Sequence, residues 1–306
     1  MDTTTTRSAP GRAVALFVAM LVSLSALAWW QAPAAEAATA APRPGNGAND
    51  TVYFIKGYTP DGISCKSKWG AATQAMRSWG WTGKFVRVGL YAADTRSKGC
   101  AVNLLDPHPE QGTVNVPIKD LGKALAWDIY NNYSSKEKSV DLVGHSMGGL
   151  IARAAIAGVQ RHEEGWPERL YVEDVVTLGT PHRGTFTNVN DDRQSKDMVQ
   201  RSDFINWLNE TPNPQAEGGT DWTLIGSGAD EAVAVSSATP APAEGWSHLV
   251  RYSPFEFISH SALRTTTRGS SYSMNYFNKG TGWRQTDIGA APIRVTHNAL
   301  YWARKW

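Results

Sequence analysis

The chain has 306 residues, a formal net charge of +2 and 42% hydrophobic residues. That length suffices for one domain with a sizeable buried core. A nearly neutral charge with no run of Lys or Arg argues against a nucleic-acid partner, which would need a basic face. The sequence contains no HExxH motif and no Cys/His cluster. It therefore predicts neither a metal site nor a cofactor.

Residues 1–40 have the pattern of an export signal that is removed. Arg7 and Arg12 precede the apolar run AVALFVAMLVSLSALAWW, and a small, Ala-rich stretch follows it. Small-x-small cleavage points occur at 35–37 and 38–40. We expect secretion by the general secretory route, because no twin-arginine pair is present. An uncleaved membrane anchor is the alternative, because the apolar run is nearly long enough to span a bilayer.

Residues 41–50 are rich in Pro, Gly and Asn and are expected to form a flexible tail before one folded domain, 51–306. Cys65 and Cys100 are the only cysteines. In an exported chain two cysteines usually pair, so we expect a disulfide that closes a loop of about 35 residues.

Short β-rich runs alternate with helical stretches from residue 51 onward. The sequence predicts strands at 51–57, 84–91, 139–144, 171–179, 222–228 and 248–253. It predicts helices at 68–81, 118–133, 147–161, 196–210 and 294–306. This alternation argues for a parallel sheet covered by helices on both faces.

The segment Gly144-His145-Ser146-Met147-Gly148 fits the pattern G-x-S-x-G. It stands between the strand VDLV and a helix, the context in which this motif exposes a nucleophilic serine on a sharp turn. Cβ atoms at Gly144 and Gly148 would collide with the adjoining strand and helix. The helix N-terminus beside the serine favours developing negative charge. Ser146 is therefore the predicted nucleophile.

The stretches GHSMGGLIAR and VVTLGTPHRGT resemble those of secreted bacterial lipases and esterases of the α/β-hydrolase superfamily. The resemblance extends over about residues 51 to 260. It implies an α/β-hydrolase fold, with an eight-stranded, mostly parallel central sheet and helices on both faces. It also implies a Ser/acid/His triad and ester hydrolysis, so that 51–306 would be a single catalytic domain.

Acyl transfer builds negative charge on a carbonyl oxygen, which two backbone N–H groups stabilise. One donor should be Met147, which follows the nucleophile. By resemblance the other is Tyr58, in the loop after the first strand. This chain has Lys56-Gly57 where the family usually has His-Gly. A backbone donor does not depend on that side chain.

The family's chain order is serine, acid, histidine. Asp230 follows a strand at the sheet edge where such folds place their sites, and GADEAV is similar to the acid-bearing turn of small bacterial lipases. Glu231 is the alternative acid. His260 in ISHSAL resembles the family's loop histidine, and His297, in the terminal helical pattern, is the alternative base. His260 would accept the proton of Ser146, oriented by Asp230.

These features predict a carboxylic-ester hydrolase acting on acylglycerols or similar lipid esters, as a monomer with transient contact with lipid interfaces. An acyltransferase, a phospholipase or a polyester hydrolase would use the same machinery, whereas a non-catalytic binding module would have lost part of the triad. The segment 185–217 has room for one helix but hardly for a large lid. His182 precedes the acid and is interpreted as a supporting residue. Asp191 and Asp192 are candidate ligands of a structural calcium, with surface charge as the simpler interpretation.

Overall fold

The computed structural model describes residues 48–59, 64–105, 113–188 and 190–300. The predicted export signal lies outside these residues, as do 41–47 of the predicted tail and 301–306 of the predicted terminal helix. No helix within the described ranges is both long enough and apolar enough to cross a membrane.

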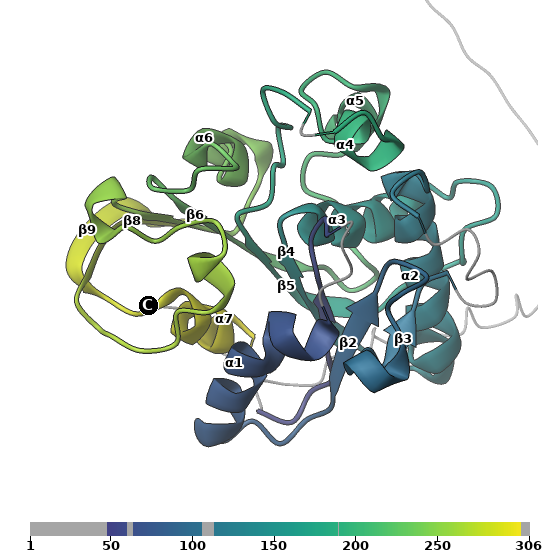
Figure 1. Cartoon of the computed structure of the whole chain (residues 1–306), viewed down its shortest axis with the longest axis horizontal. Helices are drawn as coiled ribbons and strands as arrows, with labels where there is room; N and C mark the ends of the chain where they lie inside the picture. Colours follow the sequence, from purple (N-terminus) through teal and green to yellow (C-terminus); the bar gives the residue numbers. More distant parts are fainter. Residues whose placement is uncertain (1–47, 60–63, 106–112, 189, 301–306) are drawn as a thin grey trace, which may run out of the picture. The chain divides into compact units, whose positions relative to one another are not determined.

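The described residues form a nine-stranded sheet in the order β3-β2-β1-β4-β5-β6-β7-β8-β9 (Figure 1). Neighbouring strands are parallel from β3 through β7, and the last two pairings are antiparallel. The strands are β1 Val52–Ile55, β2 Phe85–Gly89, β3 Val102–Asn103, β4 Val140–His145, β5 Val172–Leu178, β6 Asp221–Ser227, β7 His248–Tyr252, β8 Tyr272–Asn278 and β9 Gly282–Gly289. The predicted mostly parallel sheet is therefore confirmed, with one strand more than the resemblance implies.

Helices cover both faces of this sheet, as predicted (Figure 1). The principal ones are α1 Cys65–Ser78, α2 Ile118–Asn132, α3 Met147–Gln160 and α7 Pro292–Ala299. Successive side chains of β1 point to opposite faces of the sheet and so belong to two different hydrophobic cores. Tyr53 and Ile55 pack with α2 and α3. Val52 and Phe54 pack with α1 and α7.

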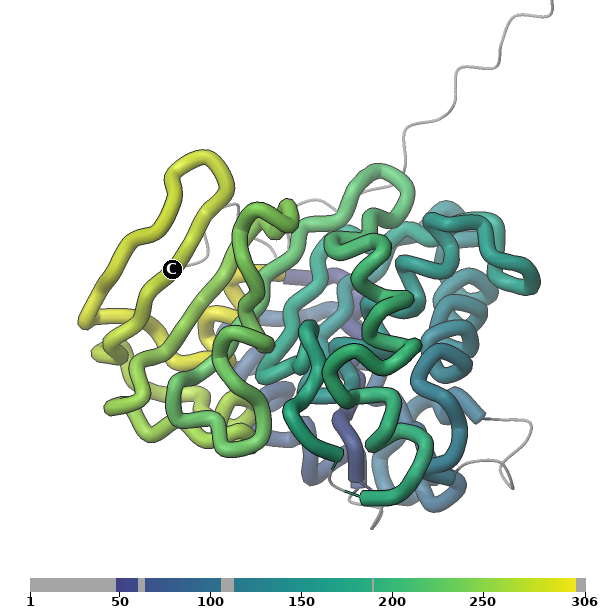
Figure 2. Tube along the Cα trace, turned by 90° about the horizontal axis from the view of Figure 1, so that it is seen from above, coloured from purple at the N-terminus to yellow at the C-terminus, as the bar shows by residue number. Residues whose placement is uncertain are grey.

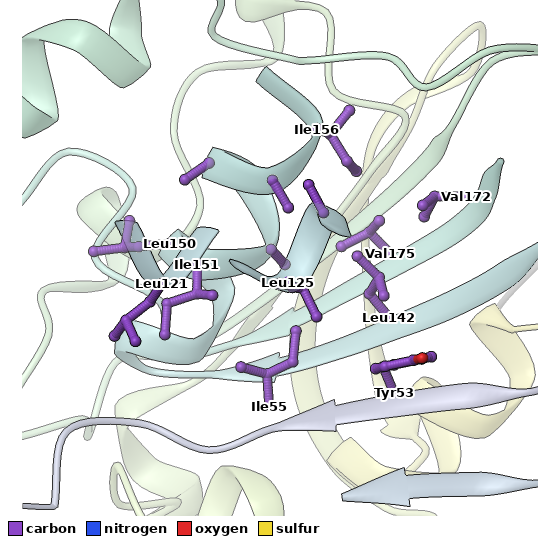
Figure 3. Packing of buried hydrophobic residues seen from close by; sticks show 14 of the residues in the cluster. Tyr53, Ile55, Leu121, Leu125, Leu142, Leu150, Ile151, Ile156, Val172 and Val175 are labelled. Carbon is purple, nitrogen blue, oxygen red and sulfur yellow. The ribbon is translucent and has the colours of Figure 1, made fainter. Parts of the chain in front are cut away.

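The core under α2 and α3 holds the helix that begins after the predicted nucleophile. In Figure 3, Leu121 and Leu125 of α2 and Leu150 and Ile151 of α3 lie over the strand residues. All of these side chains are fully buried. Each contributes roughly 1.5–3 kcal/mol of transfer free energy relative to exposure. The position of α3, and hence of the turn before it, is set by this packing.

The region predicted as one helix, 196–210, is instead two short helices, α4 Arg193–Asp197 and α5 Asp203–Asn209. The chain between them passes through Arg201 with a left-handed φ of 63°. The hydroxyl of Ser202 then accepts a hydrogen bond from the Ile205 amide and caps α5. The segment 185–217 therefore holds two helices rather than the expected one. The short helix α6 (Val235–Ala238) lies between β6 and β7.

Three strands were not predicted: β3, β8 and β9. The trace in Figure 2 shows β8 and β9 as the yellow-green hairpin at the opposite side from α2. Most residues of both strands are only half-buried or exposed. Such strands lack the apolar runs that mark buried parallel strands, so composition does not distinguish them from loops.

Cys65 and Cys100 form the predicted disulfide. The bond links Cys65, the first residue of α1, to Cys100, which lies two positions before the short edge strand β3. Both cysteines are buried. The closed loop spans a sequence separation of 35 residues.

We expect Cys65→Ala/Cys100→Ala to lower the free energy of unfolding by about 3–4 kcal/mol, because the crosslink restricts the unfolded chain. Denaturant unfolding measures the change. Added reductant should destabilise the native protein by a similar amount and leave the double variant unaffected. Equal stability of the two proteins without reductant would contradict this assignment.

Candidate active site

Ser146 occupies the strained turn that joins β4 to α3. Its φ of 57° and ψ of −129° lie in a region that residues with a side chain rarely adopt. Two neighbours hold this geometry. The Ser146 amide donates to the Leu178 carbonyl of β5 at 2.9 Å, and the Thr180 hydroxyl donates to the Ser146 carbonyl at 2.9 Å. The turn leaves Ser146 partly exposed between two buried residues.

The glycines around Ser146 are required by close backbone contacts. A Cβ on Gly144 would lie 2.5 Å from Gly149 at the start of α3. A Cβ on Gly148 would lie 2.2 Å from the Ile55 carbonyl oxygen of β1. Neither contact can relax without moving backbone. The sheet and the helix can therefore approach Ser146 this closely only with glycine at both positions.

The loop after β1 passes directly over Ser146. A Cβ on Gly57 would lie 2.7 Å from the Ser146 Cβ and 3.3 Å from its Oγ. Tyr58 follows Gly57, and Met147 is the first residue of α3, whose amide has no acceptor within the helix. The two predicted oxyanion donors thus lie on the two backbone segments that adjoin Ser146.

Tyr58 is tied to the segment that carries α4. Its hydroxyl donates to Asp192 Oδ2 at 2.5 Å and accepts from Asn190 Nδ2 at 2.7 Å. The other oxygen of Asp192 caps α4 by accepting from the Ser195 amide. Asp191 instead pairs with Lys196 at the surface. Both candidate calcium ligands therefore have protein partners, and Asp192 anchors the loop beside Ser146.

Lys56, which replaces the family's usual histidine, is buried away from solvent. Its Nζ lies 2.6 Å from Asp94 Oδ1, and both side chains are fully buried. The second oxygen of Asp94 accepts from the Leu90 and Tyr91 amides. Burial lowers the pKa of Lys56, and the hydrogen bond and charge of Asp94 oppose that shift. This ion pair thus anchors the start of the loop that carries Tyr58. Removing one partner of such a pair costs about 3–5 kcal/mol.

Asp230 and His260 meet beside the Ser146 turn. His260 Nδ1 lies 2.8 Å from Asp230 Oδ2, and the Asp230 carboxylate is fully buried while 14% of the His260 side chain is exposed. Asp230 Oδ1 also accepts from the Ala232 and Val233 amides. These donors stabilise the carboxylate as an anion. A proton on Nδ1 of His260 then leaves Nε2 as the acceptor.

The backbone of His260 is held from two further sides. Its amide donates to Glu231 Oε2 at 2.9 Å, and its carbonyl oxygen lies 2.9 Å from His145 Nε2. The rings of His145 and His260 are 4.6 Å apart. The two candidate acids therefore have different partners: Asp230 contacts the imidazole and Glu231 contacts the backbone.

His145 stays neutral in this arrangement. Burial, followed by the charges of His260, Arg264 and Lys68, lowers its pKa well below the usual value. A neutral imidazole that carries its proton on Nε2 can donate to the His260 carbonyl. His145, the residue before Ser146, thus contacts the loop of His260, and sequence reasoning missed this contact.

Two further histidines named in the sequence analysis, His297 and His182, lie elsewhere in the core. His297 packs against Trp79 and Trp81 in the core under α7, and burial lowers its pKa to about 4. His182 is buried with Nε2 at 2.9 Å from the Thr177 hydroxyl, and its carbonyl accepts from Arg153. The imidazole that contacts Asp230 is that of His260.

Two further positions escaped sequence reasoning. A Cβ on Gly179, whose φ is 56°, would lie 2.9 Å from Asp230 Oδ2 and 3.0 Å from His260 Nδ1. Arg153 of α3 is fully buried, and its guanidinium donates to the carbonyls of His182 and Leu208. Burial lowers the pKa of Arg153 to about 9. The glycine in VVTLGT was a signal for a left-handed turn; nothing in the sequence marks Arg153 as buried.

A mostly parallel sheet, a strained serine turn at the carboxyl end of a central strand and the chain order serine, acid, histidine define an α/β-hydrolase fold. Residues 119–221 match the family model of the PGAP1-like alpha/beta domain. This match includes the turn of Ser146 and extends from α2 to the start of β6.

The chain is also similar to solved lipase structures. Lipase B of Aspergillus fumigatus is 15% identical with a TM-score of 0.47, over 73% of this chain and 52% of that one. The mature lipase BlEst2 of Bacillus licheniformis is 19% identical with a TM-score of 0.41, over 64% of this chain and 80% of that one. The chain thus spans about half the length of the Aspergillus lipase. No curated protein sequence matches the chain.

We expect Asp230→Asn and Glu231→Gln to have very different effects. Asp230→Asn should lower kcat on the order of 10³–10⁴-fold, because it removes the charge that orients and stabilises the His260 imidazolium. Glu231→Gln retains an oxygen that can accept from the His260 amide and should cost less than about tenfold. Steady-state hydrolysis of a chromogenic ester measures both. A larger loss in Glu231→Gln would exchange the two roles.

Proposed function

We propose that this protein is a serine carboxylic-ester hydrolase with the triad Ser146, Asp230 and His260. The observation that carries the proposal is the contact of His260 Nδ1 with the buried carboxylate of Asp230, beside the strained turn of Ser146. A histidine oriented in this way can act as the base that a serine hydroxyl needs. A non-catalytic module would have no reason to keep a strained serine and a buried Asp-His pair together.

In the proposed reaction, Ser146 Oγ attacks the acyl carbonyl carbon while its proton passes to His260 Nε2. The oxyanion that forms accepts hydrogen bonds from the amides of Met147 and Tyr58. His260 then returns the proton to the departing alcohol, which leaves an acyl-enzyme. Water repeats the sequence and releases the carboxylic acid. Asp230 keeps the imidazole in the required tautomer and stabilises its positive charge.

The substrate we propose is a lipid ester, as for a triacylglycerol lipase or esterase. Phe255 and Phe257 lie in the turn between β7 and His260, and their side chains are 82% and 81% exposed. Glu256 holds this turn by accepting from the Ser273 amide, and Phe257 has a left-handed φ of 52°. Two outward phenylalanines on a braced turn favour contact with an apolar surface or acyl chain.

We also propose that the protein acts outside the cell as a monomer. The N-terminal pattern of an export signal and the Cys65–Cys100 disulfide both support export, because disulfides persist in oxidising compartments. Two short helices in 185–217 leave little chain for a large lid, which favours substrates that reach Ser146 without interfacial opening.

Ser146→Ala should abolish hydrolysis of a short-chain chromogenic ester and leave the unfolding midpoint nearly unchanged, because Ser146 is partly exposed. The His297→Asn variant serves as a control that should retain activity, since His297 belongs to α7 and packs against Trp79 and Trp81. A separate assay of the unmodified protein with an added alcohol acceptor distinguishes a hydrolase, which releases the free acid, from an acyltransferase, which forms a new ester. Normal turnover by Ser146→Ala would refute the proposed nucleophile.

Replacing both exposed phenylalanines, Phe255→Gln/Phe257→Asn, should lower activity on emulsified long-chain esters by roughly tenfold, because burial of each ring at the interface is lost. Activity on a soluble short-chain ester should change little. Ile288→Gln is the matched control, because Ile288 is 79% exposed on the edge strand β9. An equal loss on both substrates would assign the phenylalanines to the catalytic machinery instead of an interface.

A further inference from the structure

A basic groove with a volume of about 800 Å³ runs between α1 and β2. It is formed by one face of the helix and the first residues of the strand, and no triad residue lines it. Its lining consists of Ser64, Lys66, Ser67, Gly70, Thr73, Gln74, Arg77, Lys84, Phe85 and Arg87. We refer to these residues as the α1–β2 groove.

The helical wall of the groove is a single stripe along α1. Lys66, Gly70, Thr73 and Arg77 are separated by four, three and four positions, which places them on one face of a helix. Lys66 and Arg77 stand about 16 Å apart along the axis. Gly70 has open space where a side chain would begin. The groove is therefore elongated, with a cation at each end of the stripe and no side chain at Gly70.

The charge of the α1–β2 groove is of one sign. Its lining holds four cations and no carboxylate, although the whole chain has a net charge of only +2. The ion pairs formed among the described residues include none of these cations. Lys84 also lines the cavity on the other face of β2, where its charge acts on Asp128. Within the described part of the chain, no carboxylate forms an ion pair with Lys66, Arg77 or Arg87.

The two arginines are fixed in place, which favours binding of an anion. The Arg77 guanidinium lies over the Phe85 ring at 4.2 Å and donates to the Trp81 carbonyl. Arg87 donates to the Thr73 hydroxyl at 3.1 Å, and its buried Nε has no hydrogen-bond partner. Burial and then the charge of Arg77 lower the pKa of Arg87. An anion bound here would relieve the repulsion between two ordered guanidinium groups.

We propose that the α1–β2 groove binds an extended, soluble polyanion bearing phosphate groups. The groove is longer than a single phosphate, and its cations lie on both walls. Because the groove is concave, a flat bilayer could not enter it. The one aromatic ring in the lining is covered by Arg77, so stacking with nucleic-acid bases is not provided. The cations come from two separate elements, which explains why no run of Lys or Arg marks this face in the sequence.

The test uses linear inorganic polyphosphate and the purified protein, with binding measured by titration calorimetry at low and moderate salt. Lys66→Gln/Arg77→Gln should weaken binding by roughly tenfold or more, because two charge-assisted contacts are lost. Lys136→Gln/Lys138→Gln removes the same net charge from exposed positions on another surface and should have little effect. Gly70→Leu leaves the net charge unchanged, fills the middle of the groove and should also weaken binding, whereas Gly70→Ala should not. Ester hydrolysis should be normal in all four variants.

Several results would overturn this proposal. Equal weakening by the two double variants would reduce the effect to bulk charge. Binding of single orthophosphate as tight as that of polyphosphate would remove the requirement for an extended ligand. Tighter binding to vesicles containing phosphatidylglycerol, or to a single-stranded oligonucleotide of equal charge, would assign the surface to membranes or nucleic acid. Absence of polyphosphate binding at low salt would refute it directly.

Discussion

The left-handed backbone of Ser146 is the constraint on which the rest of the site depends. A residue with a side chain occupies this conformation only where the surrounding structure holds it, and here β1, β4, β5 and α3 all contact the turn. Gly144 and Gly148 let helix and strand approach, and Gly57 lets the next loop pass within contact of the serine. The buried packing of α3 compensates for this strain, because it fixes the helix that begins directly after Ser146.

His260 shows how segments from separate strands hold one side chain and its backbone in place. The turn after β6 supplies Asp230 for the imidazole and Glu231 for the backbone amide, and β4 supplies His145 for the carbonyl. Each contact restricts a different part of the residue. Because His260 stands on a loop, these contacts replace the rigidity that a helix or strand would provide.

The α1–β2 groove and the proposed catalytic site differ in how their charged side chains are partnered. Near Ser146 the buried Lys56 is paired with Asp94. In the α1–β2 groove four cations share one lining without a carboxylate. Pairing offsets the cost of a buried charge and fixes a loop, whereas cations without a carboxylate in the same groove are available for a ligand.

The sequence by itself determined the parallel sheet, the serine turn and the disulfide, because these depend on local signals: apolar runs, closely spaced glycines and two cysteines in a chain with an export pattern. It also ordered Asp230 before His260, and the structure brings these two residues together. Only the tertiary structure assigned Asp230 and Glu231 to different atoms of His260, since adjacent carboxylates have the same chemistry until the loop that they contact is in place. The same holds for the hairpin of β8 and β9, whose polar, half-exposed strands are defined by pairing with β7, and for the cations of α1 and β2, which converge only when helix and strand pack side by side.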